Sequence, residues 1–148
     1  MKIEVHSLRD TRVLAEKTAD LVRGRRALIC LDGDLGAGKT TFTQSLGKAL
    51  GVKNVINSPT FNIMKTYRQA DGQPFTHIDA YRLEGVHQDL GFEEYFDSGV
   101  SVVEWGGYIE EQLPADRIIM KIEEGDGENR TFEIKGTGCW KGEVEVLA

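Results

Sequence analysis

The chain has 148 residues, and its 24 Asp and Glu residues outnumber its 18 Lys and Arg residues, which gives a formal net charge of −6. This length predicts a single domain over residues 1–148, so any large partner function must be supplied by another protein. The acidic balance argues against an independent nucleic-acid binder, because phosphate backbones attract clustered Lys and Arg. No run approaches the roughly 18 apolar residues of a membrane span, and residues 1–10 lack the apolar core of a signal peptide, so a cytoplasmic location is expected.

The N-terminal segment predicts a strand followed by a helix. Residues 2–7 alternate in the way that is typical of an edge strand. A helix is expected over about residues 11–22, and either Ser7 or Asp10 can cap its N-terminus with a side-chain oxygen.

Residues 33–40 (GDLGAGKT) match the phosphate-loop pattern G-x-x-x-x-G-K-[ST] at every fixed position. The apolar residues 27–31 precede the motif and predict a buried strand, while apolar residues at a four-residue spacing follow it and predict a helix. The alternative is an ordinary glycine-rich turn between a strand and a helix. The complete motif between these two elements favours nucleotide binding.

The residue types of this motif suit the binding of nucleotide phosphates. Glycines such as Gly33 and Gly38 accept positive φ, so successive backbone N–H groups can turn inward and form a concave anion site. The following helix adds unpaired N–H donors and the positive end of its dipole. In this motif Lys39 bridges the β- and γ-phosphates, and the hydroxyl of Thr40 binds Mg²⁺.

The segment after this helix predicts a hairpin. Turn residues occupy positions 54–60, and residues 61–68 alternate like a strand. The sequence ADGQ at 70–73 indicates a tight turn, and residues 75–79 return the chain, so these two strands are expected to be antiparallel. Residues 89–97 are then typical of a short helix.

The remaining residues complete the expected fold. Residues 100–105 are apolar until Glu104 and predict a second strong strand, and one or two helical turns are expected at 109–113. Strands at 117–123 and 130–135 are joined by a hairpin. The chain is therefore expected to be an α/β protein with a three-layer P-loop NTPase fold, in which helices flank a mixed sheet with a parallel centre and antiparallel margins.

Two carboxylates stand where apolar strands end. Nucleotide hydrolysis needs an acid to hold Mg²⁺, and ligands of open α/β sheets bind at the carboxyl ends of the strands, so Glu104 and Asp79 are candidates. The alternative for each is a charged residue that marks where a strand reaches solvent.

Thr60 lies in the loop after the phosphate-loop helix, where many NTPases keep a segment that senses the γ-phosphate. A Ser-Pro-Thr turn without function is the alternative there.

Cysteine, histidine and tryptophan residues indicate no further site. Cys30 and Cys139 have neither a disulfide framework nor ligand spacing, and the three histidines are scattered, so no zinc site is expected. Trp105 is interpreted as a core anchor rather than a stacking platform.

Four segments together carry a family resemblance: GDLGAGKTTFTQ at 33–44, SPTF at 58–61, HIDAYRL at 77–83 and VEW at 103–105. Their order and spacing resemble those of the TsaE (YjeE) family of small bacterial ATPases. The resemblance covers most of the chain, from residue 8 to Arg130. The combination is specific, although the phosphate loop alone is not.

This resemblance implies a Mg²⁺-dependent ATPase that takes part in the threonylcarbamoyl modification of the adenosine beside the anticodon in tRNAs that read ANN codons. Proteins of this family act with the TsaB and TsaD proteins and do not themselves make or transfer the carbamoyl group. Their ATP binding and hydrolysis are needed for multiple turnovers. Contact with tRNA is then expected only through the complex.

The resemblance also implies, motif by motif, which residues form the site. The ATP phosphates are held by Gly36, Ala37, Gly38, Lys39, Thr40 and Thr41, with Gly33 opening the loop. Thr40 and Glu104 hold Mg²⁺, Asp79 lies near the γ-phosphate, and Thr11 and Arg130 lie on the adenine side. The candidate catalytic residues are Lys39, Asp79 and Thr60.

The sequence departs from the family after Trp105. Gly106-Gly107-Tyr108 stands where the family usually has a proline, an acid and an arginine. The departure removes one basic residue that could contact the nucleotide or a partner.

Two other functions are compatible with a phosphate loop. A small-molecule kinase closes an arginine-bearing lid over its acceptor, but no arginine occurs between Leu83 and Pro114. The second is a nucleotide-dependent interaction module with little intrinsic hydrolysis. It differs from the ATPase only in emphasis, because the ATPase can itself act as a switch on its partners. Turnover measured with and without TsaB and TsaD separates these two.

Overall fold

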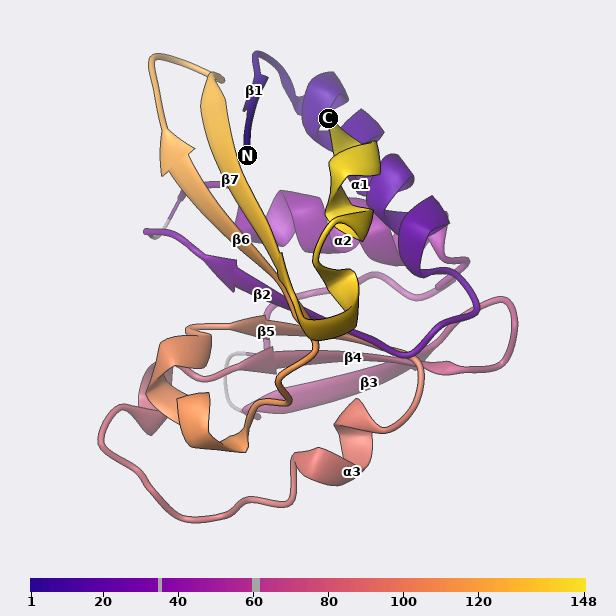
Figure 1. Cartoon of the computed structure of the whole chain (residues 1–148), viewed down its shortest axis with the longest axis vertical. Helices are drawn as coiled ribbons and strands as arrows, with labels where there is room; N and C mark the ends of the chain where they lie inside the picture. Colours follow the sequence, from indigo (N-terminus) through magenta and orange to yellow (C-terminus); the bar gives the residue numbers. More distant parts are fainter. Residues whose placement is uncertain (35, 60–61) are drawn as a thin grey trace.

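A seven-stranded sheet forms the centre of the computed structural model, which describes residues 1–34, 36–59 and 62–148. The strands are β1 (Lys2–Val5), β2 (Ala27–Asp32), β3 (Met64–Arg68), β4 (Pro74–Asp79), β5 (Val100–Glu104), β6 (Arg117–Glu124) and β7 (Arg130–Thr137). Their order across the sheet is β1-β7-β6-β2-β5-β4-β3 (Figure 1). The neighbours β6, β2, β5 and β4 are parallel, whereas β1–β7, β7–β6 and β4–β3 are antiparallel. The expected mixed sheet is confirmed.

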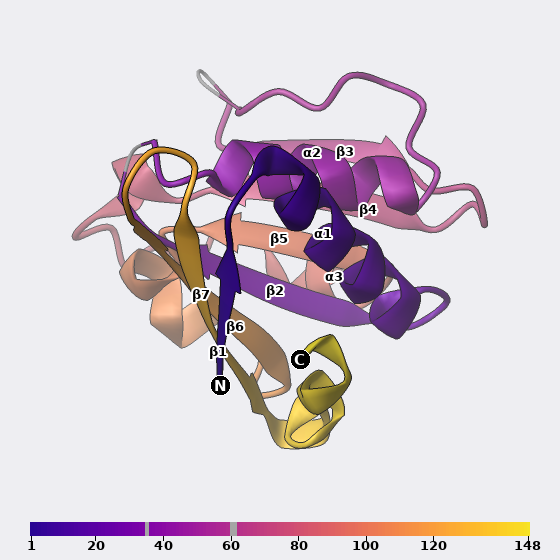
Figure 2. The ribbon, with the colours of Figure 1, turned by 90° about the horizontal axis from the view of Figure 1, so that it is seen from above.

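Helices cover both faces of this sheet. On one face, α1 (Leu8–Val22) and α2 (Lys39–Ala49) lie side by side (Figure 2). The other face is covered by three shorter elements, α3 (Glu93–Phe96) and the 3-10 helices η1 (Tyr81–Leu83) and η2 (Gly106–Gln112). Because both faces are covered, a central strand needs apolar side chains on both sides.

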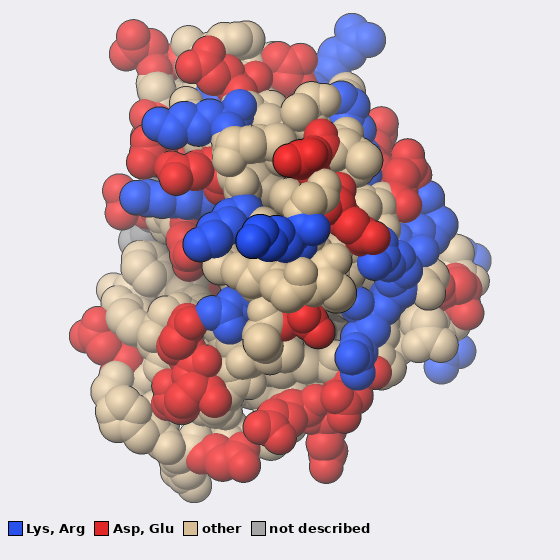
Figure 3. Space-filling model, in the orientation of Figure 1, with Lys and Arg blue, Asp and Glu red and all other residues tan. Residues whose placement is uncertain are grey.

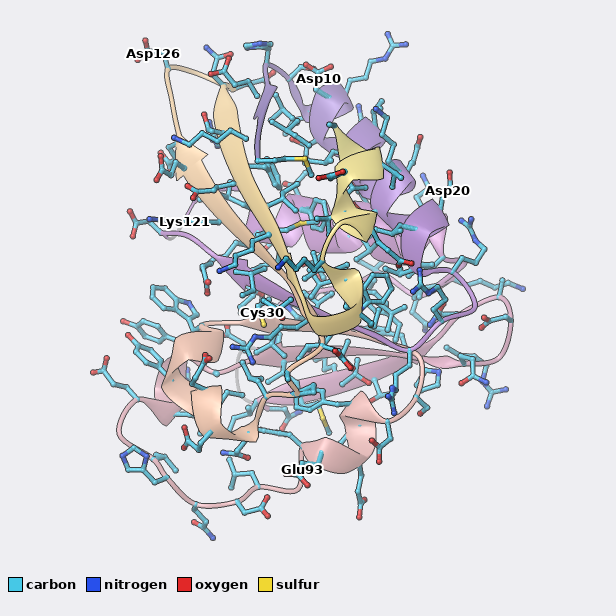
Figure 4. All side chains as sticks on the ribbon, viewed as in Figure 1. Asp10, Asp20, Cys30, Glu93, Lys121 and Asp126 are labelled. Atoms are coloured by element: carbon cyan, nitrogen blue, oxygen red, sulfur yellow. The ribbon has the colours of Figure 1, made fainter. Side chains whose placement is uncertain are left out.

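The central strand β2 shows this two-sided burial. Ile29 and Leu31 pack into the core under α1 and α2, while Leu28 and Cys30 pack into the second core, under α3 and η2. The Cys30 side chain accordingly lies in the middle of the molecule (Figure 4). An unbroken apolar run is what such a strand requires, and this run ends at the phosphate loop.

Helix α1 begins at Leu8, three residues before the expected start. Ser7 is the cap residue, and its Oγ accepts a hydrogen bond from the backbone N–H of Asp10 at 3.1 Å. This bond satisfies one of the donors that the first helical turn leaves free. Of the two candidate caps, Ser7 therefore caps the helix.

Two expected elements are shorter than the sequence pattern suggested. The helix expected over residues 89–97 is only α3, because the Asp89 carboxylate accepts a hydrogen bond from the N–H of Gly91 at 2.8 Å and forms a turn in place of a first helical turn. Strand β3 starts at Met64 rather than at residue 61. Residues 60 and 61 lie outside the described part of the chain.

The C-terminal segment folds back against α1 as two 3-10 helices, η3 (Gly138–Trp140) and η4 (Glu143–Leu147). Trp140, Val144 and Leu147 are buried in the core on the side of α1 and α2. Across the described residues, no helix has the length and apolar character needed to cross a membrane.

Candidate nucleotide-binding site

The phosphate loop leaves the sheet between β2 and α2. At its first residue, Gly33, a Cβ atom would lie 2.7 Å from the backbone oxygen of Ile122 in β6, so the close approach of the two strands requires glycine. Gly38, the cap residue of α2, has φ 103°, a conformation that side-chain-bearing residues rarely adopt. Within the described residues no side chain caps α2, so its first N–H groups are available to an anion.

Lys39, the first residue of α2, is buried and turned back toward the sheet. Its Nζ donates a hydrogen bond to the carbonyl oxygen of Gly33 at 2.6 Å and lies 3.8 Å from Oε1 of Glu104. It also lies 4.4 Å from the ring centroid of Trp105, a cation–π contact. The structure thus brings the lysine of the phosphate loop to the carboxylate that ends β5.

Three carboxylates end three neighbouring parallel strands. Asp32 ends β2, Glu104 ends β5 and Asp79 ends β4. In the pairing of these strands, Glu104 is opposite Leu31 on one side and opposite Asp79 on the other. The two acids that the sequence singled out are therefore neighbours at the carboxyl edge of the sheet, beside the phosphate loop.

The two predicted acids have different surroundings. Glu104 is only 4% exposed, and its Oε2 lies 2.5 Å from Nε2 of His77. Asp79 is half-buried, and its Oδ1 accepts a hydrogen bond from the backbone N–H of Tyr81 at 3.0 Å. Glu104 is thus fixed inside the site, whereas Asp79 lies at its margin with one oxygen engaged in a local turn.

Asp32 and His77 are site residues that the sequence reasoning missed. Burial raises the pKa of Asp32 above its ordinary value, and the nearby Lys39 ammonium opposes that rise. The signal for Asp32 was present, because it is an acid at the end of an apolar strand, as Glu104 and Asp79 are. His77 is the first residue of the HIDAYRL motif, but the sequence did not indicate its partner, which is 27 residues away in the chain.

The oxygen donors of the site suit Mg²⁺. The exposed Thr40 has a hydroxyl 3.3 Å from that of Ser58, and Glu104 supplies a carboxylate. No cluster of three or more His, Cys, Asp or Glu side chains able to hold a metal occurs in the described ranges. A pair of hard oxygen donors still fits Mg²⁺, which is usually held by one or two protein ligands together with phosphates and water. The Thr60 prediction falls outside the described residues.

Thr11 and Arg130 meet at a cavity of about 120 Å³ beside the phosphate loop. The same cavity is lined by Gly36, Ala37, Gly38 and Thr41. Arg130 also donates from Nε to the carbonyl oxygen of Ala37 at 3.2 Å, which ties β7 to the loop. Residues that lie far apart in the sequence thus come together on one side of the phosphate loop.

Trp105 packs against the second core, as expected of a core anchor, but it also faces the site. It is half-buried, its ring stacks on Tyr108 with centroids 5.7 Å apart, and Tyr81 contacts it edge-on at 5.1 Å. Its φ of 59° is the one positive value at a non-glycine residue in the described chain, a conformation that costs about 1–3 kcal/mol. The Gly106-Gly107-Tyr108 departure therefore follows a sharply turned residue that faces Lys39.

Comparison with known proteins gives a consistent result. A family model described as "Threonylcarbamoyl adenosine biosynthesis protein TsaE" matches residues 5–132. The tRNA threonylcarbamoyladenosine biosynthesis protein TsaE of Bacillus subtilis is 43% identical over 131 residues, covering 87% of this chain and 81% of that protein. The protein of the same name from Streptomyces coelicolor is 41% identical over 147 residues, covering 93% and 99%.

A solved structure agrees with these sequence matches. The crystal structure of YdiB from Bacillus subtilis superposes with a TM-score of 0.78 at 34% identity, covering 99% of this chain and 90% of that one. With the family model and relatives above 40% identity over most of their length, this chain belongs to the TsaE family.

Proposed function

We propose that the chain is a Mg²⁺-dependent ATPase, folded as one P-loop domain, that acts in the cytoplasm with TsaB and TsaD in the threonylcarbamoyl modification of tRNA. The names of its relatives support the modification. The site supports the ATPase, because an uncapped helix N-terminus, a buried lysine and strand-end carboxylates meet at one edge of the sheet.

The observation that carries the proposal is the approach of Lys39 to Glu104 at 3.8 Å. In a P-loop ATPase the lysine binds the β- and γ-phosphates and the strand-end acid holds the metal. A buried ammonium that already shares a site with a buried carboxylate matches that division of labour. An ordinary glycine-rich turn has no need of either group.

Each candidate residue takes one role in this proposal. Lys39 binds phosphate, Thr40 and Glu104 hold Mg²⁺, and Asp79 orients the attacking water near the γ-phosphate. When bound by Thr40 and Glu104, Mg²⁺ would supply positive charge to offset the charge that develops on the phosphoryl group. Thr60 is assigned to the segment that senses the γ-phosphate.

The adenine side is assigned to the cavity between Thr11 and Arg130. Phe132 also lines this cavity, with its ring buried in the core against Phe42. Equilibrium binding of ATP, ADP and GTP tests this assignment, with preference for the adenine nucleotides as the expected result. Equal affinity for GTP would contradict it.

Phosphate release, measured for the chain alone and with purified TsaB and TsaD, tests the proposed function. We expect slow phosphate release by the chain alone and faster release with both partners. Lys39→Ala should release no phosphate in either condition.

Pull-downs with ATP, with ADP and without nucleotide test whether partner binding follows the nucleotide state. Tight ATP binding without release, even with both partners, would favour a nucleotide-dependent interaction module.

A further inference from the structure

His77 lies in β4 and is fully buried, and the one hydrogen bond that its side chain makes to the described residues is with the carboxylate of Glu104. Nε2 of His77 lies 2.5 Å from Oε2 of Glu104. Nδ1 of the same ring has no partner in the described part of the chain. As far as the described residues go, the ring therefore hydrogen-bonds to Glu104 alone.

The chemistry of the pair decides which group donates. The proposed function requires an ionised Glu104, and an ionised carboxylate only accepts hydrogen bonds, so Nε2 of His77 is assigned as the donor. The donor is present whether or not Nδ1 is protonated. A charge-assisted bond of this kind is stronger than one between neutral groups.

The contact divides the two oxygens of Glu104. Oε2 is bound to His77, while Oε1 faces Nζ of Lys39 at 3.8 Å. Rotation of the carboxylate group would break the bond to His77 in a buried environment, where an unpaired polar group is costly. Oε1 is therefore the oxygen held toward the phosphate loop.

We propose that His77 is a positioning residue that fixes Glu104 so that Oε1 is presented to the cation accompanying the nucleotide. This inference rests on the proposed function, in which Glu104 holds Mg²⁺. Groups that hydrogen-bond to metal ligands orient them, and their loss typically lowers metal affinity about 10- to 100-fold. A purely structural His77 would instead affect nucleotide binding equally with and without Mg²⁺.

The test compares ADP affinity in MgCl₂ with ADP affinity in EDTA for each variant by titration calorimetry. His77→Leu keeps much of the volume but removes the donor, and His77→Gln keeps an N–H at a similar reach. Thr76→Val is the matched control, because Thr76 is the buried neighbour in β4 and its hydroxyl has no partner in the described residues.

We expect His77→Leu to lower the Mg²⁺-dependent gain in ADP affinity about 10-fold or more. The ADP affinity of His77→Leu in EDTA should stay near the wild-type value. His77→Gln should recover part of the Mg²⁺-dependent gain, and Thr76→Val should match the wild type. An unchanged gain in His77→Leu, or an equal loss with and without Mg²⁺, would overturn the inference.

Two further comparisons keep the result decisive. If His77→Leu fails to fold, His77→Gln is compared with His77→Asn, whose shorter amide cannot reach Glu104. Equal Mg²⁺-dependent gains in ADP affinity for these two variants would also overturn the inference. A wild-type chain that binds ADP without any Mg²⁺ gain would contradict the proposed function itself. A normal wild-type gain that His77 variants retain would contradict only the role of His77.

Discussion

Lys39 is held in this structure by a carbonyl oxygen, a carboxylate and an aromatic ring. The contacts to Gly33, Glu104 and Trp105 give its ammonium group a full set of partners while it remains buried. A bound phosphate must compete with these partners for the same group. In the proposed function, the residue therefore links the nucleotide to the carboxyl edge of the sheet.

Replacing Lys39 with alanine should weaken ATP and ADP binding by about 10- to 100-fold, with or without Mg²⁺, because a charge-assisted contact to phosphate is lost. Thr40→Ala should instead weaken binding mainly in the presence of Mg²⁺. Titration calorimetry in MgCl₂ and in EDTA distinguishes the two. Lys17→Ala, at an exposed lysine of α1, is the control and should bind as the wild type does. Wild-type hydrolysis by Lys39→Ala would refute the site.

Glu104 and Asp79 should differ in what their amide variants lose. If Glu104 holds the metal, Glu104→Gln should raise the Mg²⁺ concentration needed for hydrolysis, whereas Asp79→Asn should lower turnover and leave Mg·ATP affinity largely intact. Mg²⁺ titrations of phosphate release with both variants measure this difference. The exposed Glu94→Gln serves as a control. A larger shift in metal dependence for Asp79→Asn would mean that the two roles are reversed.

The two thiols should react very differently. Burial raises the pKa of Cys30 to about 12, so its thiol stays protonated at any pH near neutral and ionises only as the pH approaches that value, whereas Cys139 is exposed. Because the thiolate is the nucleophile, a thiol reagent at pH 8 should label one cysteine rapidly. Cys139→Ser should remove the rapid phase and Cys30→Ser should leave it. Rapid labelling of both thiols in the folded protein would contradict the burial of Cys30.

At the scale of whole elements, the turn from β7 into the C-terminal segment depends on one glycine. Gly136 is buried near the end of β7, and a Cβ added there would lie 2.2 Å from the backbone oxygen of Trp140. That oxygen cannot move without displacing η3, whose Trp140 is part of the core and lies under the guanidinium of Arg25 at 4.1 Å. The glycine therefore permits the tight return of the chain.

Gly136→Ala should lower the free energy of unfolding by about 1–3 kcal/mol, because the added methyl group overpacks a backbone contact. Gly107→Ala is a suitable control, since a Cβ at Gly107 meets no atom within 4 Å. Urea unfolding of both variants gives the comparison. Equal stability of the two variants would show that the return of the chain is not tightly packed.

At the scale of the molecule, charge is unevenly distributed. The segment between Leu83 and Pro114 contains eight Asp and Glu residues but no Lys or Arg. Acidic side chains accordingly gather along the lower rim of the face in Figure 3, around α3 and the loops beside it. This rim would repel the phosphates of a nucleic acid.

The isolated chain should therefore bind tRNA no more tightly than a Kd of about 10⁻⁵ M at physiological salt, within the range of non-specific binding. Fluorescence anisotropy with labelled tRNA over a series of salt concentrations measures this affinity. Addition of the partner proteins is the comparison, since basic contacts with tRNA are then expected from them. Tight binding by the chain alone, with a steep salt dependence, would overturn the charge argument.

The sequence by itself determined the local features. The phosphate loop, the strand before it and the helix after it are set by spacing within about 25 residues, and the glycines permit the positive φ that the loop requires. The alternation of apolar residues likewise predicted the strands and the hairpin at 70–73, and strand-end acids pointed to Glu104 and Asp79. Element boundaries were less certain, because a single side-chain contact such as Ser7 with Asp10 moves a helix end by a turn.

Only the tertiary structure decided which distant residues meet. The strand order places β4 beside β5, and these adjacent strands bring His77 to Glu104 across 27 residues of sequence. The same is true of Arg130, which lies in β7, one strand further from β2 than β6, and donates a hydrogen bond to Ala37 across 93 residues of sequence. Local propensity cannot specify such contacts, because they depend on which strands pair and on the order of the strands in the sheet. Strand pairing is driven by the burial of apolar side chains over the whole core.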